Sequence, residues 1–292
     1  RESGIAWLGL ARVQRLLGNT EEATETLTRA RRLLPDEDPS AAAESALLCL
    51  DKGDLEGATQ HIDAASIRGE GAIVSYVRGN IAARQGHLRS ALTYFDEAIQ
   101  IDPTHVRARL NRTSIHMANE DAQSALDDAK VLLELAPGLA LAKLRRAEAN
   151  MMLSNWEEAK DDLEQIVEDA PHHHHALTQL ASCFMAMDRP EKAEAPLNEA
   201  LRLAPDHTEA WHQRGLLYLD WAQEESALND FEAAVRCDGN HLGARLRIAA
   251  IHHKAERFPE ALGAWNGVLA IEPEHTVARR RREECEMALA TI

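Results

Sequence analysis

Histidines are the residues of this sequence that first suggest chemistry, because imidazole is the commonest metal ligand in proteins. His172–His175 are four consecutive imidazoles. Adjacent residues entering a helix spread their rings around its axis, and no carboxylate or thiol joins this run at a ligand spacing. We therefore expect a polar loop there and no metal site. His252 and His253 are expected at the surface or rim for the same reason.

The cysteines also lack a reactive arrangement. They are few and widely separated, without C-x-x-C spacing: Cys49, Cys183, Cys237 and Cys285. This pattern predicts buried or half-buried free thiols in a reducing compartment, with no cysteine–histidine pair. The chain also lacks a glycine-rich phosphate loop, G-x-S-x-G and H-E-x-x-H. The sequence thus predicts a protein that is not an enzyme and has no catalytic, metal-binding or cofactor-binding residues.

Paired acidic residues are the remaining candidates for acid–base work. Asp127–Asp128, Glu157–Glu158 and Asp161–Asp162 lie in segments with helical periodicity. We expect these carboxylates to lie on helices and to face solvent, where their pKa values stay ordinary.

The helices that carry these residues recur with a fixed period. In residues 208–241, Trp211, Gly215 and Tyr218 share one helix face, and Ala227 and Phe231 start the same spacing after a polar turn. The small residue opening the second helix recurs at steps of 35, 33 and then 34: Ala23, Ala58, Ala91, Ala125, Ala159, Ala193, Ala227 and Ala261. A helix-stopping residue recurs every 34 positions: Pro35, Gly69, Pro103, Pro137, Pro171, Pro205, Gly239 and Pro273.

This pattern resembles the tetratricopeptide repeat (TPR), two antiparallel helices in 34 residues. Arg214 stands where the family usually has leucine, and Gly239 where it usually has proline. The resemblance implies an all-α, right-handed α-solenoid. Its eight TPR-like repeats, together spanning 4–275, are 4–37, 39–71, 72–105, 106–139, 140–173, 174–207, 208–241 and 242–275. Residues 276–292 are expected to form a C-terminal capping helix that solvates the last repeat.

Repeat two departs most from the pattern. Its first helix starts late, after Pro39, and its exit R-G-E-G carries two glycines. We expect the stack of repeats to be less rigid at repeat two than elsewhere.

Composition restricts the class of partner. The net charge of −16 disfavours nucleic acid and anionic membranes, and no apolar run is long enough to span a bilayer. A protein or peptide partner with apolar and basic character is favoured. We expect a cytoplasmic location, or a periplasmic one if a signal peptide has been removed, since the chain begins without Met.

The resemblance also implies a concave groove lined by first helices. Carrying the family's groove positions over, we expect partner contacts from Tyr76, Asn80, Leu110, Asn111, Met117, Leu144, Arg145, Met151 and Met185. Met117, Met151 and Met185 are 34 residues apart. They would stack as a ladder along the groove and contact the apolar surface of a partner helix or peptide. The alternative is that these methionines fill space between neighbouring helices.

One subfamily of these repeats holds the C-terminal carboxylate of heat-shock chaperones with a clamp of five side chains. Its five positions can be compared with this sequence. Asn80, Asn111 and Arg145 occupy three of its five positions, but Tyr76 and Leu141 stand where the two lysines are needed. Without those ammonium groups, the charge that holds a carboxylate pair is largely missing. The sequence therefore disfavours chaperone-tail binding.

Together these observations predict a non-catalytic scaffold that binds a partner peptide or helix in its groove. Two alternatives are an arm of a larger bacterial secretion, exopolysaccharide-export or envelope-assembly protein, and a self-associating homo-oligomer.

Overall fold

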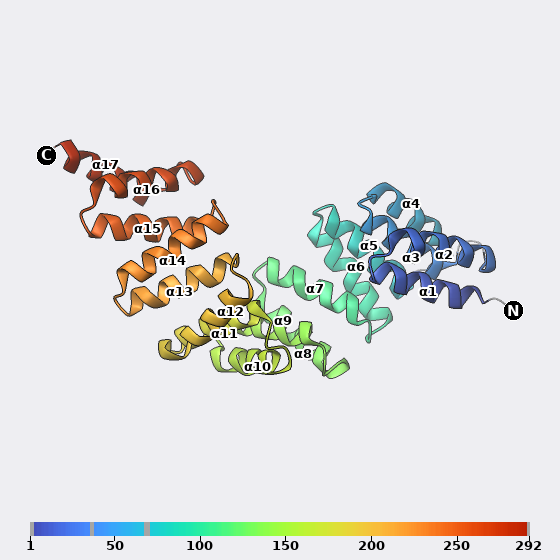
Figure 1. Cartoon of the computed structure of the whole chain (residues 1–292). Coiled ribbons are helices and arrows are strands. Elements are labelled where there is room, and N and C mark those ends of the chain that lie inside the picture. The colour runs from blue at the N-terminus through green and yellow to red at the C-terminus, as the bar shows by residue number, and fades with distance from the viewer. Residues whose placement is uncertain (1–2, 36–37, 67–70, 291–292) are drawn as a thin grey trace. The chain divides into compact units, whose positions relative to one another are not determined.

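The computed structural model describes residues 3–35, 38–66 and 71–290, all of them in α-helices, a short 3-10 turn and connecting loops (Figure 1). The described residues contain no strand, which confirms the predicted all-α solenoid class. Gly69 and most of the repeat-two exit lie outside the described residues. The chain divides into two compact units, residues 1–153 and 154–292.

In the first unit, helices pack in antiparallel pairs and in chain order. We call the odd-numbered helices first helices and the even-numbered ones second helices. The helices are α1 (Gly4–Leu16), α2 (Thr20–Leu33), α3 (Pro39–Asp51), α4 (Leu55–Ser66), α5 (Ala72–Arg84), α6 (Leu88–Ile101), α7 (Val106–Ala118), α8 (Ala122–Leu135) and α9 (Ala140–Met152). Helix α3 starts at Pro39 itself and not after it. Asp38 caps it by accepting hydrogen bonds from the N–H groups of Ser40 and Ala41.

The second unit continues the same alternation, beginning with a second helix. Its elements are α10 (Trp156–Asp169), α11 (His174–Ala186), the 3-10 turn η1 (Pro190–Lys192), α12 (Glu194–Leu203), α13 (Thr208–Asp220), α14 (Glu224–Cys237), α15 (Leu242–Lys254), α16 (Phe258–Ile271) and α17 (Thr276–Ala290). Among the described residues, no helix is both long and apolar enough to cross a membrane.

Each turn from a first to a second helix contains one residue with left-handed backbone. In the first three turns this residue is glycine, with φ between 78° and 82°. In the other five it carries a side chain and has φ between 55° and 62°: Glu120, Ser154, Asp188, Ala222 and Glu256. A Cβ atom makes this conformation costly, so the later turns hold local strain.

Replacing Ala222 by glycine should therefore stabilise the second unit. We expect the free energy of unfolding to rise by about 1 kcal/mol, because the Cβ penalty of left-handed backbone is removed. Urea denaturation of the wild type and of Ala222→Gly would measure it. The reverse change, Gly86→Ala, serves as the control and should destabilise by a similar amount.

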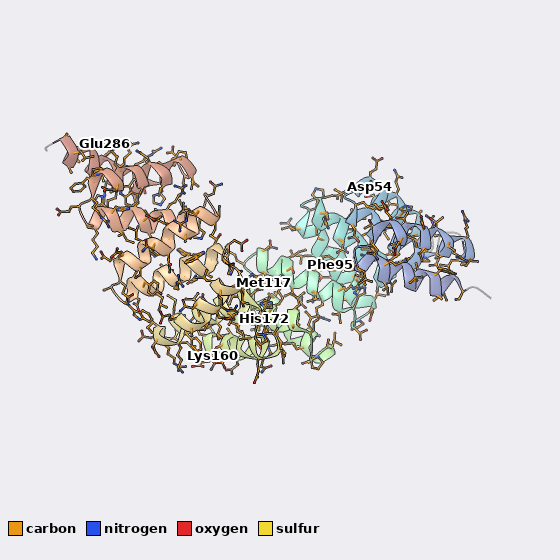
Figure 2. All side chains as sticks on the ribbon, viewed as in Figure 1. Asp54, Phe95, Met117, Lys160, His172 and Glu286 are labelled. Atoms are coloured by element: carbon orange, nitrogen blue, oxygen red, sulfur yellow. The ribbon has the colours of Figure 1, made fainter. Side chains whose placement is uncertain are left out.

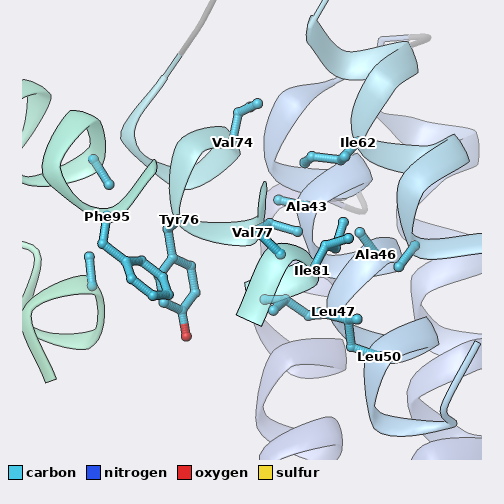
Figure 3. Packing of buried hydrophobic residues seen from close by; sticks show 14 of the residues in the cluster. Ala43, Ala46, Leu47, Leu50, Ile62, Val74, Tyr76, Val77, Ile81 and Phe95 are labelled. Carbon is cyan, nitrogen blue, oxygen red and sulfur yellow. The ribbon is translucent and has the colours of Figure 1, made fainter. Parts of the chain in front are cut away.

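Small residues set the distance between the two helices of a pair. All eight alanines that open second helices are at most 1% exposed, as the repeat pattern predicts. A Cβ atom built on Gly79 would lie 2.5 Å from Cε1 of Phe95. Figure 3 shows Phe95 beside Tyr76 in the largest described cluster of buried residues. Large residues on one helix are thus matched by small ones on the other.

The expectation that all the paired carboxylates face solvent is wrong for Asp128 and Asp162, which are 4% and 2% exposed. Asp128 faces the first helix of its pair and accepts hydrogen bonds from Arg109 at 3.0 Å and Arg112 Nε at 2.8 Å. Asp230 accepts from Arg214 in the same way. Arginine at these first-helix positions therefore offsets the desolvation of a buried carboxylate.

Helix α17, on which Glu286 lies (Figure 2), ends the second unit and is rich in charged residues. Its arginines pair with glutamates one turn away: Arg281 with Glu284 at 2.8 Å and Arg282 with Glu286 at 3.4 Å. These pairs offset part of the positive charge of Arg279–Arg282.

Candidate functional site

First helices of the first unit line a pocket of about 370 Å³. Its lining residues come from α1, α3, α5 and α7, and they are Arg15, Leu47, Leu50, Asp51, Tyr76, Asn80, Ala83, Arg84 and Asn111. Three of the predicted groove residues, Tyr76, Asn80 and Asn111, thus meet at one concavity.

The two asparagines of this pocket bind each other. Asn111 Nδ2 donates to Asn80 Oδ1 at 2.6 Å. This bond leaves the Asn80 amide nitrogen and the Asn111 amide oxygen as a donor and an acceptor at the pocket. Tyr76 is held in place by packing, since its ring lies 6.2 Å from Phe95 and 4.9 Å from His105, measured between centroids.

Two arginines of the pocket differ in their partners. Arg15 is held by Glu44 at 2.5 Å and Asp51 at 3.0 Å. Burial acts to lower the pKa of Arg15, but the hydrogen bonds to these carboxylates outweigh it and raise that pKa. Arg84 forms no ion pair within the part of the chain that the structure describes. It is therefore the cation of this pocket that a ligand can reach.

The other predicted groove residues of the first unit do not line this pocket. Leu110, Leu144 and Met151 are half-buried, and Arg145 donates to Glu148 at 2.7 Å. Met117 packs against a buried cluster formed by Ala125, Leu126 and Ala149. This contact is the one expected of a space-filling methionine.

Met185 is half-buried on α11, in the second unit. The methionine ladder spans both units and stays a prediction.

The predicted groove omits six of the pocket residues. Two of them, Ala83 and Arg84, lie in repeat three, and the other four lie in repeats one and two, to which the register was not applied. Leu47, Leu50 and Asp51 on α3 correspond to Asn80, Ala83 and Arg84 on α5, 33 residues later. A register corrected for the 35- and 33-residue steps would have found these three. Arg15 could be recognised only from its reach to Glu44 and Asp51.

Histidines cap first helices, a role absent from the sequence prediction. The Nδ1 atoms of His105, His173, His241 and His275 accept hydrogen bonds from the backbone N–H three residues later, at 3.0–3.2 Å. This is the N-cap geometry usually supplied by asparagine or serine. Within the run predicted as a polar loop, His173 is thus a cap, whereas His172 and His174 are exposed.

Glu209, His212 and His241 place three possible metal ligands within 4.8 Å of one another. His241 Nδ1 already accepts the Ala244 N–H, so the ring proton lies on Nε2, which is 3.7 Å from the Glu209 carboxylate. A metal on Nε2 would move that proton to Nδ1, against the Ala244 N–H. The geometry therefore favours a carboxylate–imidazole cluster over a preformed metal centre.

This cluster changes the acidity of its carboxylate. Burial acts to raise the pKa of Glu209. The imidazole of His212, 3.8 Å away, with the hydrogen bond that Gln213 donates at 2.6 Å and the nearby imidazole of His241, outweighs burial and lowers that pKa to about 2.

His207 should make the second unit sensitive to mild acid. Burial, and then the charges of His174 and His175, lower the pKa of His207, and its Nε2 atom is buried without a partner. As the pH falls below about 6.5, the unfolded chain binds a proton that the folded chain does not. Stability is therefore full above that pH and is lost as the pH falls towards the folded-state pKa of His207, by at most about 1.4 kcal/mol per pH unit.

Chemical denaturation from pH 7.5 to 5 tests this expectation. His207→Asn removes the titratable ring and places a residue favoured at N-caps before α13, so the stability of the variant should fall less steeply than that of the wild type. Parallel curves for the two proteins would contradict the prediction.

The expectation that no cysteine–histidine pair exists is wrong. Cys285 Sγ lies 3.3 Å from His253 Nδ1, and His253 Nε2 lies 3.4 Å from Glu284. His252 and His253 are both half-buried on α15, and His253 faces α17. Burial raises the pKa of the Cys285 thiol, which is 0% exposed. A buried thiol of raised pKa is a poor nucleophile, and we assign it a packing role.

The other thiols agree in part with the sequence analysis. All four cysteines are free; Cys183 is buried and Cys49 half-buried, but Cys237 is exposed.

Comparison with protein families identifies the repeat unit. Models described as tetratricopeptide repeat match residues 72–105, 151–214 and 208–241. A comparison with curated proteins gave no match.

Solved structures share the fold at low sequence identity. The APC/C hetero-tetramer Cut9–Hcn1 is 15% identical with a TM-score of 0.69, covering 96% of this chain and 55% of that one. A tetratricopeptide repeat protein from Parabacteroides merdae is 18% identical with a TM-score of 0.56, covering 85% and 98%. TTC0263 from Thermus thermophilus is 19% identical with a TM-score of 0.54, covering 62% and 99%. These neighbours show the fold. The three family matches identify tetratricopeptide repeats in residues 72–105 and 151–241 of this chain.

Proposed function

We propose that this chain is a non-catalytic scaffold of eight repeats that binds an extended peptide segment of a partner protein in the first-unit pocket. A general role in protein interaction is supported by the tetratricopeptide repeats themselves. The observation that carries the finer proposal is the Asn80–Asn111 pair facing a concave surface.

The pocket offers groups that match a peptide. The remaining amide donor of Asn80 and acceptor of Asn111 fit the C=O and N–H of one backbone, whatever its sequence. Leu47, Leu50 and Tyr76 supply apolar surface for a side chain. The first helices hold these groups in place before binding, so little ordering is needed when the peptide arrives.

Charge at the pocket is mixed, with Asp51 and Arg15 paired and Arg84 unpaired among the described residues. The basic character expected of the partner therefore rests on the net charge of the whole chain and not on this pocket. Leu110, Met117, Leu144, Arg145, Met151 and Met185 stay predicted extensions of the groove. An export arm and a homo-oligomer stay alternative predictions.

Selection of random 12-residue peptides against the full chain, followed by fluorescence anisotropy, tests the proposal. We expect the combined change Asn80→Ala and Asn111→Ala to weaken binding about 10-fold or more, since each lost hydrogen bond contributes about 1 kcal/mol. Asn229→Ala, an exposed asparagine on α14, is the matched control and should leave the affinity unchanged. Equal affinities for all three proteins would refute the assignment of this pocket.

A further inference from the structure

A second pocket of the first unit is lined by basic side chains from three helices. Its volume is about 150 Å³, and Arg31 of α2, Lys52 at the end of α3 and His61 of α4 all line it. Helix α3 packs against both α2 and α4 (Figure 1), so the pocket lies where these three helices meet. None of its lining residues is acidic, and it shares none of them with the pocket of Asn80 and Asn111. We call it the basic pocket.

The three basic residues are peculiar to this place in the chain. Once the steps of 35 and 33 are allowed for, no other repeat carries a basic residue at any of the three corresponding positions. The residues that correspond to Arg31 are Ser66, Ile99, Leu133, Val167, Leu201, Val235 and Leu269. Those that correspond to Lys52 are Leu17, Gln85, Asn119, Leu153, Met187, Trp221 and Ala255. Those that correspond to His61 are neutral or acidic, as at Tyr94 and Asp128. The repeat fold therefore does not require these basic residues.

The groove one repeat later has a different lining. It lies between α4, α5 and α6, has a volume of about 280 Å³, and is lined by Gln85 and Tyr94 where the basic pocket has Lys52 and His61. Its lining also includes a carboxylate, that of Asp63. A hollow at this place thus occurs in two successive repeats, but only the first of them is basic.

Two of the three basic residues have no carboxylate partner. Neither Arg31 nor Lys52 forms an ion pair among the residues that the structure describes, although Asp and Glu outnumber Lys and Arg by 48 to 32 in this chain. Lys52 Nζ donates to Thr24 Oγ1 at 2.9 Å, which holds the ammonium group against α2 and leaves its other two N–H donors for a ligand. Both basic side chains are exposed, so a ligand can reach them.

The third basic residue, His61, is half-buried. Burial lowers the pKa of His61, and the positive charge of Arg31 lowers it further, against the opposite effect of Asp54. The charge of Arg31 thus reaches the imidazole of His61. Asp54 is itself engaged, since it accepts the backbone N–H of Gly57 at 2.8 Å. A neutral imidazole still carries one N–H donor, so His61 can donate a hydrogen bond to a ligand.

We propose that the basic pocket binds a phosphate group, either as inorganic phosphate or as the phosphate monoester of a small molecule. A phosphate monoester carries a charge of about −1.5 to −2 at neutral pH and has three strong acceptor oxygens. These match two cations and an imidazole that come from three helices, whereas a carboxylate offers only two oxygens. The volume of about 150 Å³ is below the roughly 300 Å³ at which pockets for drug-sized ligands begin. The pocket therefore fits the phosphate group and leaves an ester substituent in solvent.

Isothermal titration calorimetry of the full chain with sodium phosphate tests the proposal, at neutral pH and at an ionic strength kept constant with sodium chloride. We expect saturable binding of one phosphate per chain. Lys52→Gln, which copies Gln85 of the next groove, should weaken this binding about 10-fold or more, because it removes a charge-assisted hydrogen bond. Combining Lys52→Gln with Arg31→Gln should remove measurable binding.

Arg32→Gln is the matched control. Arg32 follows Arg31 on α2, is also exposed and does not line the pocket. This variant loses the same charge and should keep the affinity of the wild type. Far-UV circular dichroism checks that the variants stay folded, as expected for changes of exposed side chains. Absence of saturable binding by the wild type, or equal weakening by Arg31→Gln and Arg32→Gln, would refute the proposal.

Two further ligands define the chemistry of the site. Binding of glycerol 3-phosphate as well as inorganic phosphate would assign the pocket to monoesters, and binding of inorganic phosphate alone would assign it to the free ion. Succinate, a dianion without a tetrahedral group, should not compete with phosphate. Succinate that bound as tightly as phosphate would overturn the assignment, because charge alone would then account for the binding.

Discussion

Arg214→Leu is expected to lower the free energy of unfolding of the second unit by about 3–5 kcal/mol, the range for breaking a buried ion pair. Arg214 donates to both oxygens of Asp230, at 2.7 and 2.9 Å. The two side chains are 17% and 6% exposed. Removing the guanidinium leaves a carboxylate with little water and no cation. Asn198, which accepts from the same arginine at 2.7 Å, also loses a partner.

A second substitution should reverse most of this loss. The combined change Arg214→Leu and Asp230→Leu removes both charges and leaves apolar groups of similar volume, an exchange that is often neutral or stabilising. Repeat six gives a natural precedent, since Leu180 and Pro196 occupy the two corresponding positions. Urea denaturation of the wild type, the two single variants and the double variant measures the coupling. A double variant as unstable as Arg214→Leu would show that the carboxylate is not the cause of the loss.

Phe231→Ala is expected to destabilise the second unit by about 3–5 kcal/mol, because it leaves a cavity where two helices cross. The ring is 0% exposed and lies against the backbone of Gly215, where an added Cβ atom would approach Cε1 to 2.7 Å. The loss should appear as a lower denaturation midpoint with an unchanged dependence on denaturant concentration.

The pairing of large and small residues provides the control for this prediction. Gly215→Ala should itself destabilise, by about 1–3 kcal/mol, because the new methyl group meets the ring. Combining Gly215→Ala with Phe231→Leu copies Ala181 and Leu197 of repeat six, both 0% exposed, and should be less harmful than Phe231→Ala. If the combination were the least stable of the three, volume matching at this crossing would be wrong.

Helix pairing and turn positions could be predicted because they depend on nearby residues. Trp211, Gly215 and Tyr218 share a face through helix geometry, whatever the rest of the fold does. The buried alanine near the start of each second helix was correctly predicted for the same reason. Asn80, Asn111 and Tyr76 could be assigned to one groove because their register repeats from helix to helix. That they line one pocket is a result of the structure.

The sequence by itself thus determined the helical repeat, its period and the small residues at each crossing, because these follow from spacings of three, four and 34. Tertiary structure decided which polar groups became partners. Asp128 is buried because Arg112, 16 residues earlier, packs across from it, and Cys285 meets His253, 32 residues earlier, only when α15 and α17 lie together. Such pairs depend on side-chain reach between helices, which residue spacing does not specify.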